Sequence, residues 1–262
     1  MLGIDVSGWQ KTISWRAIAD AGVEFGFIKA TQGTDYVNSA YDRHRKAARR
    51  LGIPVGAYHY AEPYEEAGPI AEADYFLEMA RPRAGDLLPV LDLEEGGLRP
   101  KALARWAKRW LRRVEQRIGQ PPILYTYSSF WTSTVGNAPG FERHPLWLAN
   151  YGKDDGKVYP VRTVGSWPSI AVHQYTSKGR IAGWPDPVDL NRLRKGWKLD
   201  DLRLGAEPPP SPGYGPPWRL LAKGEVLHEA TRLNRAFLAR AAEQAKAGGV
   251  ATIRGTLREP DA

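Results

Sequence analysis

Two carboxyl residues, separated by a single leucine, stand at the end of the apolar run Leu88-Pro89-Val90-Leu91-Asp92-Leu93-Glu94. If this run is a strand, Asp92 and Glu94 share one face, with Cα atoms roughly 6.6 Å apart. Charge repulsion and burial should then raise the pKa of at least one carboxyl group. A protonated carboxyl beside a carboxylate is the pair that glycoside hydrolysis requires, with retaining and inverting stereochemistry both open at this spacing. The alternative without catalysis is a strand that runs into an acidic surface loop.

Other polar side chains stand where further predicted strands end. Asp5 closes the first predicted strand, and Asp189 closes the last together with Asn191. First and last strands are neighbours in a closed barrel, so both carboxyl groups should converge at the carboxyl-terminal end, where parallel α/β barrels carry their active sites. Four carboxyl groups could hold a divalent metal. No acidic metal-loop pattern and no His pair with ligand spacing is present, so we expect neither metal nor cofactor.

The elements that must position these residues alternate between short β-branched or apolar runs and longer helical patterns. This alternation predicts an α/β fold with a parallel sheet. Helical spacing fades after the fifth strand, which favours a TIM-like barrel with an irregular second half over a regular eightfold repeat. The predicted strands are 2–6, 25–30, 54–61, 87–93, 122–127, 146–150, 170–175 and 188–191, and the predicted helices are 15–21, 40–51, 70–80 and 101–118.

Composition changes sharply after the predicted barrel, which we assign to residues 1–203. Residues 204–217 are rich in proline and glycine and predict a semi-extended linker. Residues 218–262 form a small helical or α+β appendage of unknown role, with a helix predicted over 225–247 and a short apolar stretch at 250–253. A segment of this size can hardly bury a core of its own.

The composition and the net charge limit the kinds of partner that we expect for this protein. The chain has no cysteine, which excludes disulfides and thiolate chemistry, and its net charge of +8 favours a polyanionic partner. An anionic cell wall fits this charge, whereas no nucleic-acid reader motif is found. The amino-terminal residues do not resemble a signal peptide and no apolar run could span a membrane, so we expect a soluble protein that acts outside its cell of synthesis only after release by another factor, such as a holin, or by lysis. One helix carries a basic face, which is either ordinary solvated surface or a docking surface for wall polymers or anionic lipid: Arg105, Lys108, Arg109, Arg112, Arg113 and Arg117.

Taken in order, the segments at the strand ends resemble family 25 of the glycoside hydrolases, the lysozymes that act as N-acetylmuramidases and include phage endolysins. The resemblance covers residues 1 to about 200. The matching segments are Gly3-Ile4-Asp5-Val6-Ser7, Phe27-Ile28-Lys29-Ala30-Thr31, Gly56-Ala57-Tyr58-His59-Tyr60, Leu91-Asp92-Leu93-Glu94, Leu146-Trp147-Leu148-Ala149, His173-Gln174-Tyr175 and Val188-Asp189-Leu190-Asn191.

The resemblance implies a flattened, irregular (β/α)5(β)3 barrel and assigns roles to the residues. It implies that Glu94 is the general acid/base, that Asp92 polarises the 2-acetamido group of the substrate, and that Asp5 and Asp189 complete an acidic floor. The acetamido oxygen would be the internal nucleophile, which gives net retention. The side chains implied to line a groove for bacterial peptidoglycan are Tyr58, Tyr60, Tyr125, Trp147 and Gln174.

Two further residues and a second hypothesis bear on the predicted site. Gln32 stands where relatives commonly carry glutamate, which removes a charge at the edge of the groove. His59 lies between two tyrosines and should point to the opposite face of its strand, as a structural histidine. A second hypothesis is a catalytically silent module that binds cell-wall glycan in the same groove.

Overall fold

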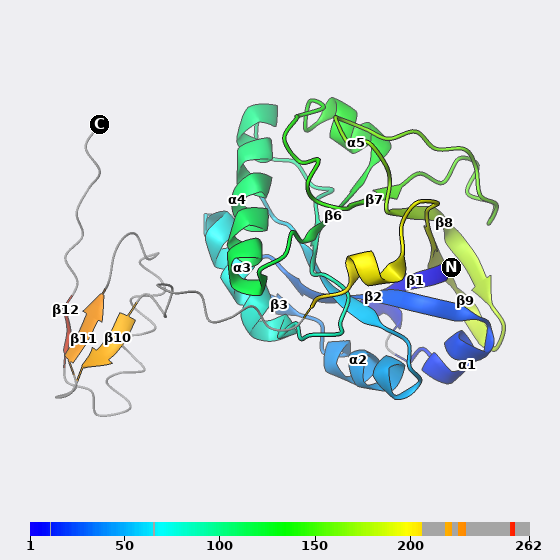
Figure 1. Cartoon of the computed structure of the whole chain (residues 1–262), viewed down its shortest axis with the longest axis horizontal. Coiled ribbons are helices and arrows are strands. Elements are labelled where there is room, and N and C mark those ends of the chain that lie inside the picture. Colours follow the sequence, from blue (N-terminus) through cyan, green and yellow to red (C-terminus); the bar gives the residue numbers. More distant parts are fainter. Residues whose placement is uncertain (11, 65, 206–217, 222–224, 229–251, 255–262) are drawn as a thin grey trace. The chain divides into compact units, whose positions relative to one another are not determined.

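The computed structural model describes residues 1–10, 12–64, 66–205, 218–221, 225–228 and 252–254 (Figure 1). The chain divides into two compact units, Met1–Glu207 and Pro208–Ala262. Nine strands of the first unit form one sheet, which closes on itself because β1 pairs with both β2 and β9. The described residues of the second unit form a separate sheet of three strands.

The barrel has parallel neighbours from β1 through β8, whereas β9 is antiparallel to both of its neighbours. A helix follows each of the first five barrel strands and none follows the last three before the chain reaches Leu199, which confirms the predicted TIM-like (β/α)5(β)3 barrel. The barrel strands are β1 (Leu2–Val6), β2 (Val23–Gln32), β4 (Val55–Tyr60), β5 (Val90–Asp92), β6 (Ile123–Tyr127), β7 (Leu146–Ala149), β8 (Val172–Ile181) and β9 (Trp184–Leu193).

The helices lie outside the strands and bury one apolar face each (Figure 1). In α4 (Pro100–Ile118), buried side chains recur every three or four residues from Leu103 to Ile118; proline starts the helix and Gly119, with φ of 77°, ends it. The remaining elements of the first unit are α1 (Trp15–Asp20), α2 (Tyr41–Arg50), α3 (Gly68–Ala80), α5 (Ser128–Ser133), the short strand β3 (Tyr36–Val37), and the 3₁₀ turns η1 (Gly8–Gln10) and η2 (Leu199–Leu202).

Aromatic rings fill the interior of the barrel beneath its carboxyl-terminal end. Phe27 stacks on Trp147 with ring centroids 4.4 Å apart, and Phe25 meets Phe27 edge to face at 6.1 Å. Glycine on the neighbouring strand makes room for a ring, because a Cβ at Gly3 would lie 2.3 Å from the Phe25 ring. The interior is therefore a solid floor for any site above it.

The structure corrects two predicted strands. The fourth strand is β5 (Val90–Asp92), shorter than 87–93, because Pro89 has no amide hydrogen and the Leu88 amide instead donates to Leu202 O at 2.8 Å. The last strand is also not parallel to the others. Only two residues connect Ile181 to Trp184, and such a connection joins antiparallel strands, so β9 is longer than predicted and Asp189 lies in its middle.

In the second unit, β10 (Trp218–Leu221) pairs antiparallel with β11 (Glu225–His228), which pairs parallel with β12 (Thr252–Arg254). The predicted helix over 225–247 is therefore wrong at its start, and its remainder lies outside the described residues. Most of the predicted linker also lies outside them. Leu204 is buried and exchanges backbone hydrogen bonds with residues 85 and 86, so it belongs to the first unit.

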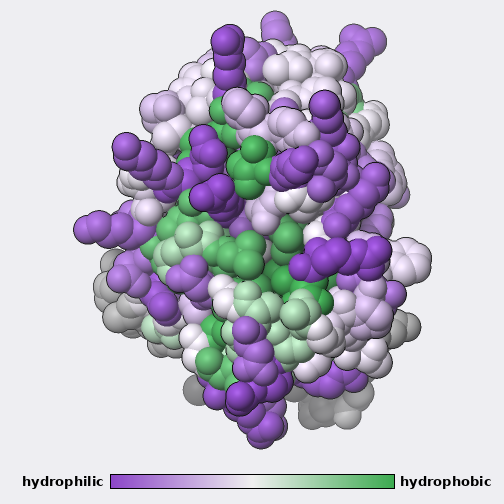
Figure 2. Space-filling model, turned by 90° about the vertical axis from the view of Figure 1, so that its right-hand side faces the viewer, coloured by the Kyte–Doolittle hydropathy of each residue, from purple (hydrophilic) through white to green (hydrophobic). Residues whose placement is uncertain are grey.

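The face that Figure 2 shows is largely hydrophilic, with apolar side chains gathered in its middle. Among the described residues, no helix combines the length and the apolar character needed to cross a membrane. Several large apolar or aromatic side chains are exposed at the last residue of a parallel strand or in a segment that directly follows one, at the carboxyl-terminal end of the barrel: Trp9, Tyr36, Val37, Tyr64 and Tyr127.

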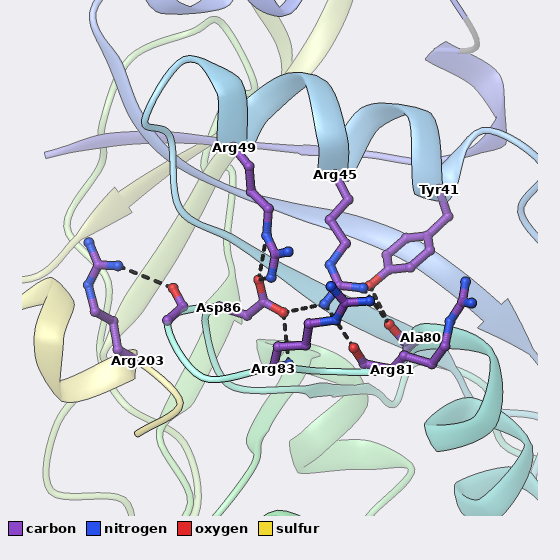
Figure 3. A network of polar contacts seen from close by, with 9 residues as sticks. Tyr41, Arg45, Arg49, Ala80, Arg81, Arg83, Asp86 and Arg203 are labelled. Atoms are coloured by element: carbon purple, nitrogen blue, oxygen red, sulfur yellow. Dashed lines mark hydrogen bonds and ion pairs between the residues drawn. The ribbon is translucent and has the colours of Figure 1, made fainter. Parts of the chain in front are cut away.

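An ion-pair network ties α2 to the segment between α3 and β5 (Figure 3). Asp86, buried, accepts hydrogen bonds from Arg45 Nη2 at 2.5 Å, from Arg49 and from the Arg83 backbone amide at 2.9 Å. Arg45 also donates to the carbonyl oxygens of Ala80 and Arg81, at 3.0 and 2.8 Å. Both charged groups are thus desolvated and fully engaged, which makes loss of either partner costly.

Replacing Asp86 with alanine should lower the free energy of unfolding by about 3–5 kcal/mol, because it leaves the Arg45 guanidinium buried without its counter-charge. Urea denaturation of the full chain measures this loss. The matched control is Asp42→Ala, which breaks the exposed pair with Arg81 and should cost less than about 1 kcal/mol. Equal losses for the two variants would contradict a special role for the buried network.

Candidate active site

The four predicted carboxyl groups meet at the carboxyl-terminal end of the barrel. Asp5 and Asp189 are directly paired in the β1–β9 register, so their side chains share the inner face. Asp92 is the last residue of β5, and Glu94 follows it by two residues. Asp92 and Asp5 are buried, whereas Glu94 and Asp189 are partly exposed. The structure thus brings together four residues that are up to 184 positions apart in the sequence (189 − 5).

Two side-chain amides hold Asp5. Gln174 Nε2 and Asn191 Nδ2 both donate to Asp5 Oδ2, at 2.9 and 2.7 Å. Trp147 Nε1 donates to Asn191 Oδ1 at 2.7 Å, and the hydroxyl groups of Tyr125 and Tyr151 donate to Gln174 Oε1. Burial raises the pKa of Asp5 to about 6, although both amide hydrogen bonds lower it. The amides therefore favour an ionised Asp5 within a closed polar network.

The other carboxyl groups carry raised pKa values for the same main reason. Burial, followed by repulsion from Asp5, raises the pKa of Glu94 to about 7 and that of Asp189 to about 8. The pKa of Asp92 lies well above its ordinary value, through burial and then through repulsion from Glu94. Near neutral pH the cluster therefore holds protons, and a partly exposed Glu94 is able to give one to a bound molecule.

Asp92 has a further property. Its Oδ1 atom is buried and accepts no hydrogen bond from the described residues. A buried carboxylate oxygen without a donor costs free energy that a donor from a ligand would recover. This carboxyl group is thus prepared to accept an N–H or O–H from a substrate.

Lys29 is a cation next to the acidic cluster. Its ammonium group lies over the Tyr60 ring, 4.4 Å from the centroid, and 5.3 Å from the centroid of Tyr36. Burial lowers the pKa of Lys29, and the charges of Asp92 and Glu94 oppose this shift. In return the ammonium group lowers the pKa of both carboxyl groups. Lys29 therefore limits how far the cluster retains its protons.

The amide of Gln32 connects Lys29 to a further carboxyl group. Its Oε1 accepts from Lys29 Nζ at 2.5 Å, and its Nε2 donates to Glu62 Oε1 at 2.6 Å. An ionised glutamate at this position could accept from Lys29 but could not donate to Glu62. The glutamine thus gives a neutral bridge between opposite charges.

The predicted groove-lining residues lie deeper than a groove wall. Tyr58, Tyr125, Trp147 and Gln174 are all buried, and only Tyr60 is partly exposed, its hydroxyl donating to Glu95 Oε1 at 2.9 Å. Their assignment to substrate binding stays a prediction. The prediction that the reaction uses no metal or cofactor also stays open, although no three His, Asp or Glu side chains of the described part are arranged to hold an ion.

The sequence-based list of site residues left out several members of the site. Lys29 acts electrostatically on the cluster, Asn191 and Tyr151 belong to its hydrogen-bonding network, and each of the three stands within one residue of the end of a predicted strand. That position was the available signal. His59 is structural, as predicted: it points away from the site, with Nε2 2.7 Å from Glu72 Oε2 and Nδ1 2.8 Å from Thr31 Oγ1.

Comparisons with known proteins agree with this geometry. The family described as Glycosyl hydrolases family 25 matches residues 4–184. Lysozyme M1 of Streptomyces globisporus is 33% identical over 202 residues, which cover 73% of this chain and 67% of that protein. An N,O-diacetylmuramidase of Chalaropsis is 34% identical over 187 residues, covering 66% of this chain and 86% of that protein. The crystal structure of a bacterial lysozyme from Streptomyces coelicolor superposes with a TM-score of 0.70 at 30% identity, covering 77% of this chain and 94% of that chain.

The raised pKa values predict how stability depends on pH. Folding raises the pKa of Asp5, Glu94 and Asp189 from near 4 to about 6, 7 and 8, so the folded state binds protons more tightly. The contribution of these three groups to the stability of the folded protein is complete at pH values below their pKa in the unfolded chain. It is lost as the pH rises through their pKa values in the folded protein. The melting temperature should therefore rise as pH falls from about 8.5 to about 6.5. Below that window, protonation of histidines that are buried with lowered pKa, such as His59, opposes the trend.

Glu94→Gln should raise the melting temperature at the alkaline end of this window and flatten its dependence on pH, because the variant carries no proton there to lose. Differential scanning calorimetry across the window measures both effects. Glu78→Gln, at an exposed position on α3, should leave the dependence unchanged. A wild-type melting temperature that falls on acidification within the window would contradict the assigned pKa directions.

Proposed function

The chain belongs to glycosyl hydrolases family 25, and from this premise we propose that it is a muramidase. The bond it cleaves is the β-1,4 bond between N-acetylmuramic acid and N-acetylglucosamine in bacterial peptidoglycan. The observation that carries the proposal is a partly exposed Glu94 with a pKa of about 7 beside a buried Asp92. Glu94 supplies the proton, and Asp92 supplies the anion once a substrate N–H and the charge of Lys29 stabilise its ionised form.

In the proposed reaction, Glu94 gives its proton to the glycosidic oxygen as the bond to the anomeric carbon breaks. The oxygen of the 2-acetamido group of the substrate bonds to that carbon from the opposite face and forms a cyclic oxazolinium ion. Water then attacks the anomeric carbon and gives its proton to the Glu94 carboxylate, which restores the acid. Two displacements at one carbon leave the configuration retained.

The buried Oδ1 of Asp92 supports its role in this scheme. A carboxylate that accepts the substrate N–H strengthens the acetamido oxygen as a nucleophile and stabilises the positive charge that develops on the ring. Asp5 is already held by two amides, so its charge acts at a distance on the same cation. Asp189, paired with Asp5, completes the acidic floor.

A catalytically silent module that binds glycan is the second hypothesis. Such a module would gain nothing from holding four mutually repelling carboxyl groups together, since their repulsion destabilises the folded state. One variant separates the two hypotheses, because only the enzyme depends on a transferable proton at residue 94.

Glu94→Gln should lower the rate of peptidoglycan cleavage by about 10²–10⁴-fold, since the amide has no transferable proton. Digested peptidoglycan is reduced with borohydride, and the new reducing ends are identified by mass spectrometry. The wild type should yield muramitol ends. Glucosaminitol ends would instead show cleavage of the other glycosidic bond, and an absence of new ends would support the silent module.

The matched control is Glu95→Gln. Its amide oxygen can still accept the Tyr60 hydroxyl hydrogen, so most of the activity should remain. A loss as large as that of Glu94→Gln would mean that the carboxyl groups of this segment act collectively and not through one acid.

We further propose that α4 attracts anionic wall polymers. This helix carries seven basic side chains; of these, Arg113 pairs with Asp74 and Lys108 donates to Pro139 O. Arg105, Arg109 and Arg112 are exposed, and their spacing of four and three residues places them on one stripe. Such a stripe attracts polyanions at low ionic strength.

Replacing Arg105, Arg109 and Arg112 together with glutamine should reduce binding to whole cell walls roughly three- to tenfold at low salt, and the difference should vanish at high salt. Cosedimentation with walls measures the binding. Activity on soluble glycan should not change. The control replaces Lys46, Arg50 and Lys195, also exposed, and removes the same charge elsewhere. If both variants lose binding equally, net charge and not the α4 stripe is responsible.

A further inference from the structure

Trp9 is the most exposed large hydrophobic side chain among the described residues. Ninety-two per cent of its surface is accessible, although indole rings normally bury most of their area. It lies in η1, the turn that directly follows β1 and the Asp5 carboxyl group. The exposed indole therefore stands at the end of the barrel that carries the acidic cluster.

The turn that carries Trp9 is held by side chains. Ser7 Oγ accepts from the Trp9 amide at 3.3 Å, and Gln10 Oε1 accepts from the Ser7 amide at 2.9 Å. Gly8 packs against β3 so closely that a Cβ there would lie 2.7 Å from the Tyr36 hydroxyl oxygen. The indole is thus presented by a braced turn, so its binding to a ligand would order little additional chain.

A line of side chains connects this turn to the carboxyl groups. Tyr36, 40% exposed, meets Gly8 on one side and lies over the ammonium group of Lys29 on the other. Lys29 in turn lies over Tyr60 and acts electrostatically on Asp92 and Glu94. A chain of contacts therefore leads from the turn that carries Trp9 to the acidic cluster, and it includes the rings of Tyr36 and Tyr60.

We propose that Trp9 and Tyr36 form an outlying sugar-stacking subsite that binds an N-acetylhexosamine of the glycan strand beyond the two sugars at the cleaved bond. The inference rests on the proposed function for the identity of the strand. The apolar C–H face of a pyranose ring stacks on an indole, and the rim of the sugar keeps its hydroxyl and acetamido groups in water. Because the subsite lies away from the reacting atoms, it contributes equally to binding substrate and transition state.

Long and short glycan strands, freed of stem peptides and separated by size, test the subsite. Trp9→Ala should raise KM for long strands about tenfold with kcat unchanged, and should leave KM for strands too short to reach the subsite as it is. Trp9→Phe should restore most of the affinity, since it keeps a stacking ring. Leu51→Ala, an exposed truncation at the end of α2, should have no effect.

Binding without turnover gives an independent measurement. In the Glu94→Gln background, long strands should change the tryptophan fluorescence, and adding Trp9→Ala should weaken binding by a similar factor in calorimetric titrations. Unchanged KM and unchanged affinity in the Trp9→Ala variants would overturn the subsite and leave a muramidase in place. If the wild type releases no muramitol ends, the proposed function fails, and the titrations with the Glu94→Gln protein still decide whether Trp9 binds glycan.

Discussion

Four carboxyl groups share the mouth of one barrel, and their desolvation and repulsion are what the surrounding structure must offset. A buried, ionised carboxyl group is costly unless donors or a counter-charge surround it. The protein applies three different solutions: Asp5 receives two amide donors, Asp92 and Glu94 lie in the field of Lys29, and Asp189 keeps partial exposure. These interactions offset the desolvation and repulsion of the carboxyl groups only in part, so the pKa values stay raised. Raised pKa values are the property that acid catalysis needs.

Closely packed aromatic rings lie below this cluster. Phe27 and Trp147 stack in the barrel interior, and the indole nitrogen of Trp147 donates to the same Asn191 that holds Asp5. One ring thus belongs to both the apolar floor and the polar network. This coupling ties Asp5 to the packed interior of the barrel, so that the position of this carboxyl group does not depend on loops.

The site therefore has a buried layer that sets protonation and an exposed layer that meets the substrate. Trp147, Tyr125 and Gln174 belong to the first layer, and they act on a ligand only through the groups they orient. Lys29 joins the layers, because it lies between the partly exposed Tyr60 and the exposed Tyr36. The neutral bridge of Gln32 holds Lys29 and Glu62 together at that junction without adding another carboxylate.

The sequence by itself determined the strand and helix alternation, the barrel class, and the four carboxyl residues, because these depend on local periodicity and on residue type at strand ends. Tertiary structure alone decided how those residues meet. The direction of β9 follows from a two-residue connection, and the length of β5 follows from one proline and a distant carbonyl group. The partners of Asp5, the stacking of Lys29 and the burial of the predicted groove residues depend on strands far apart in the chain. Burial and charge interactions between such strands are properties of the closed barrel, and no local pattern encodes them.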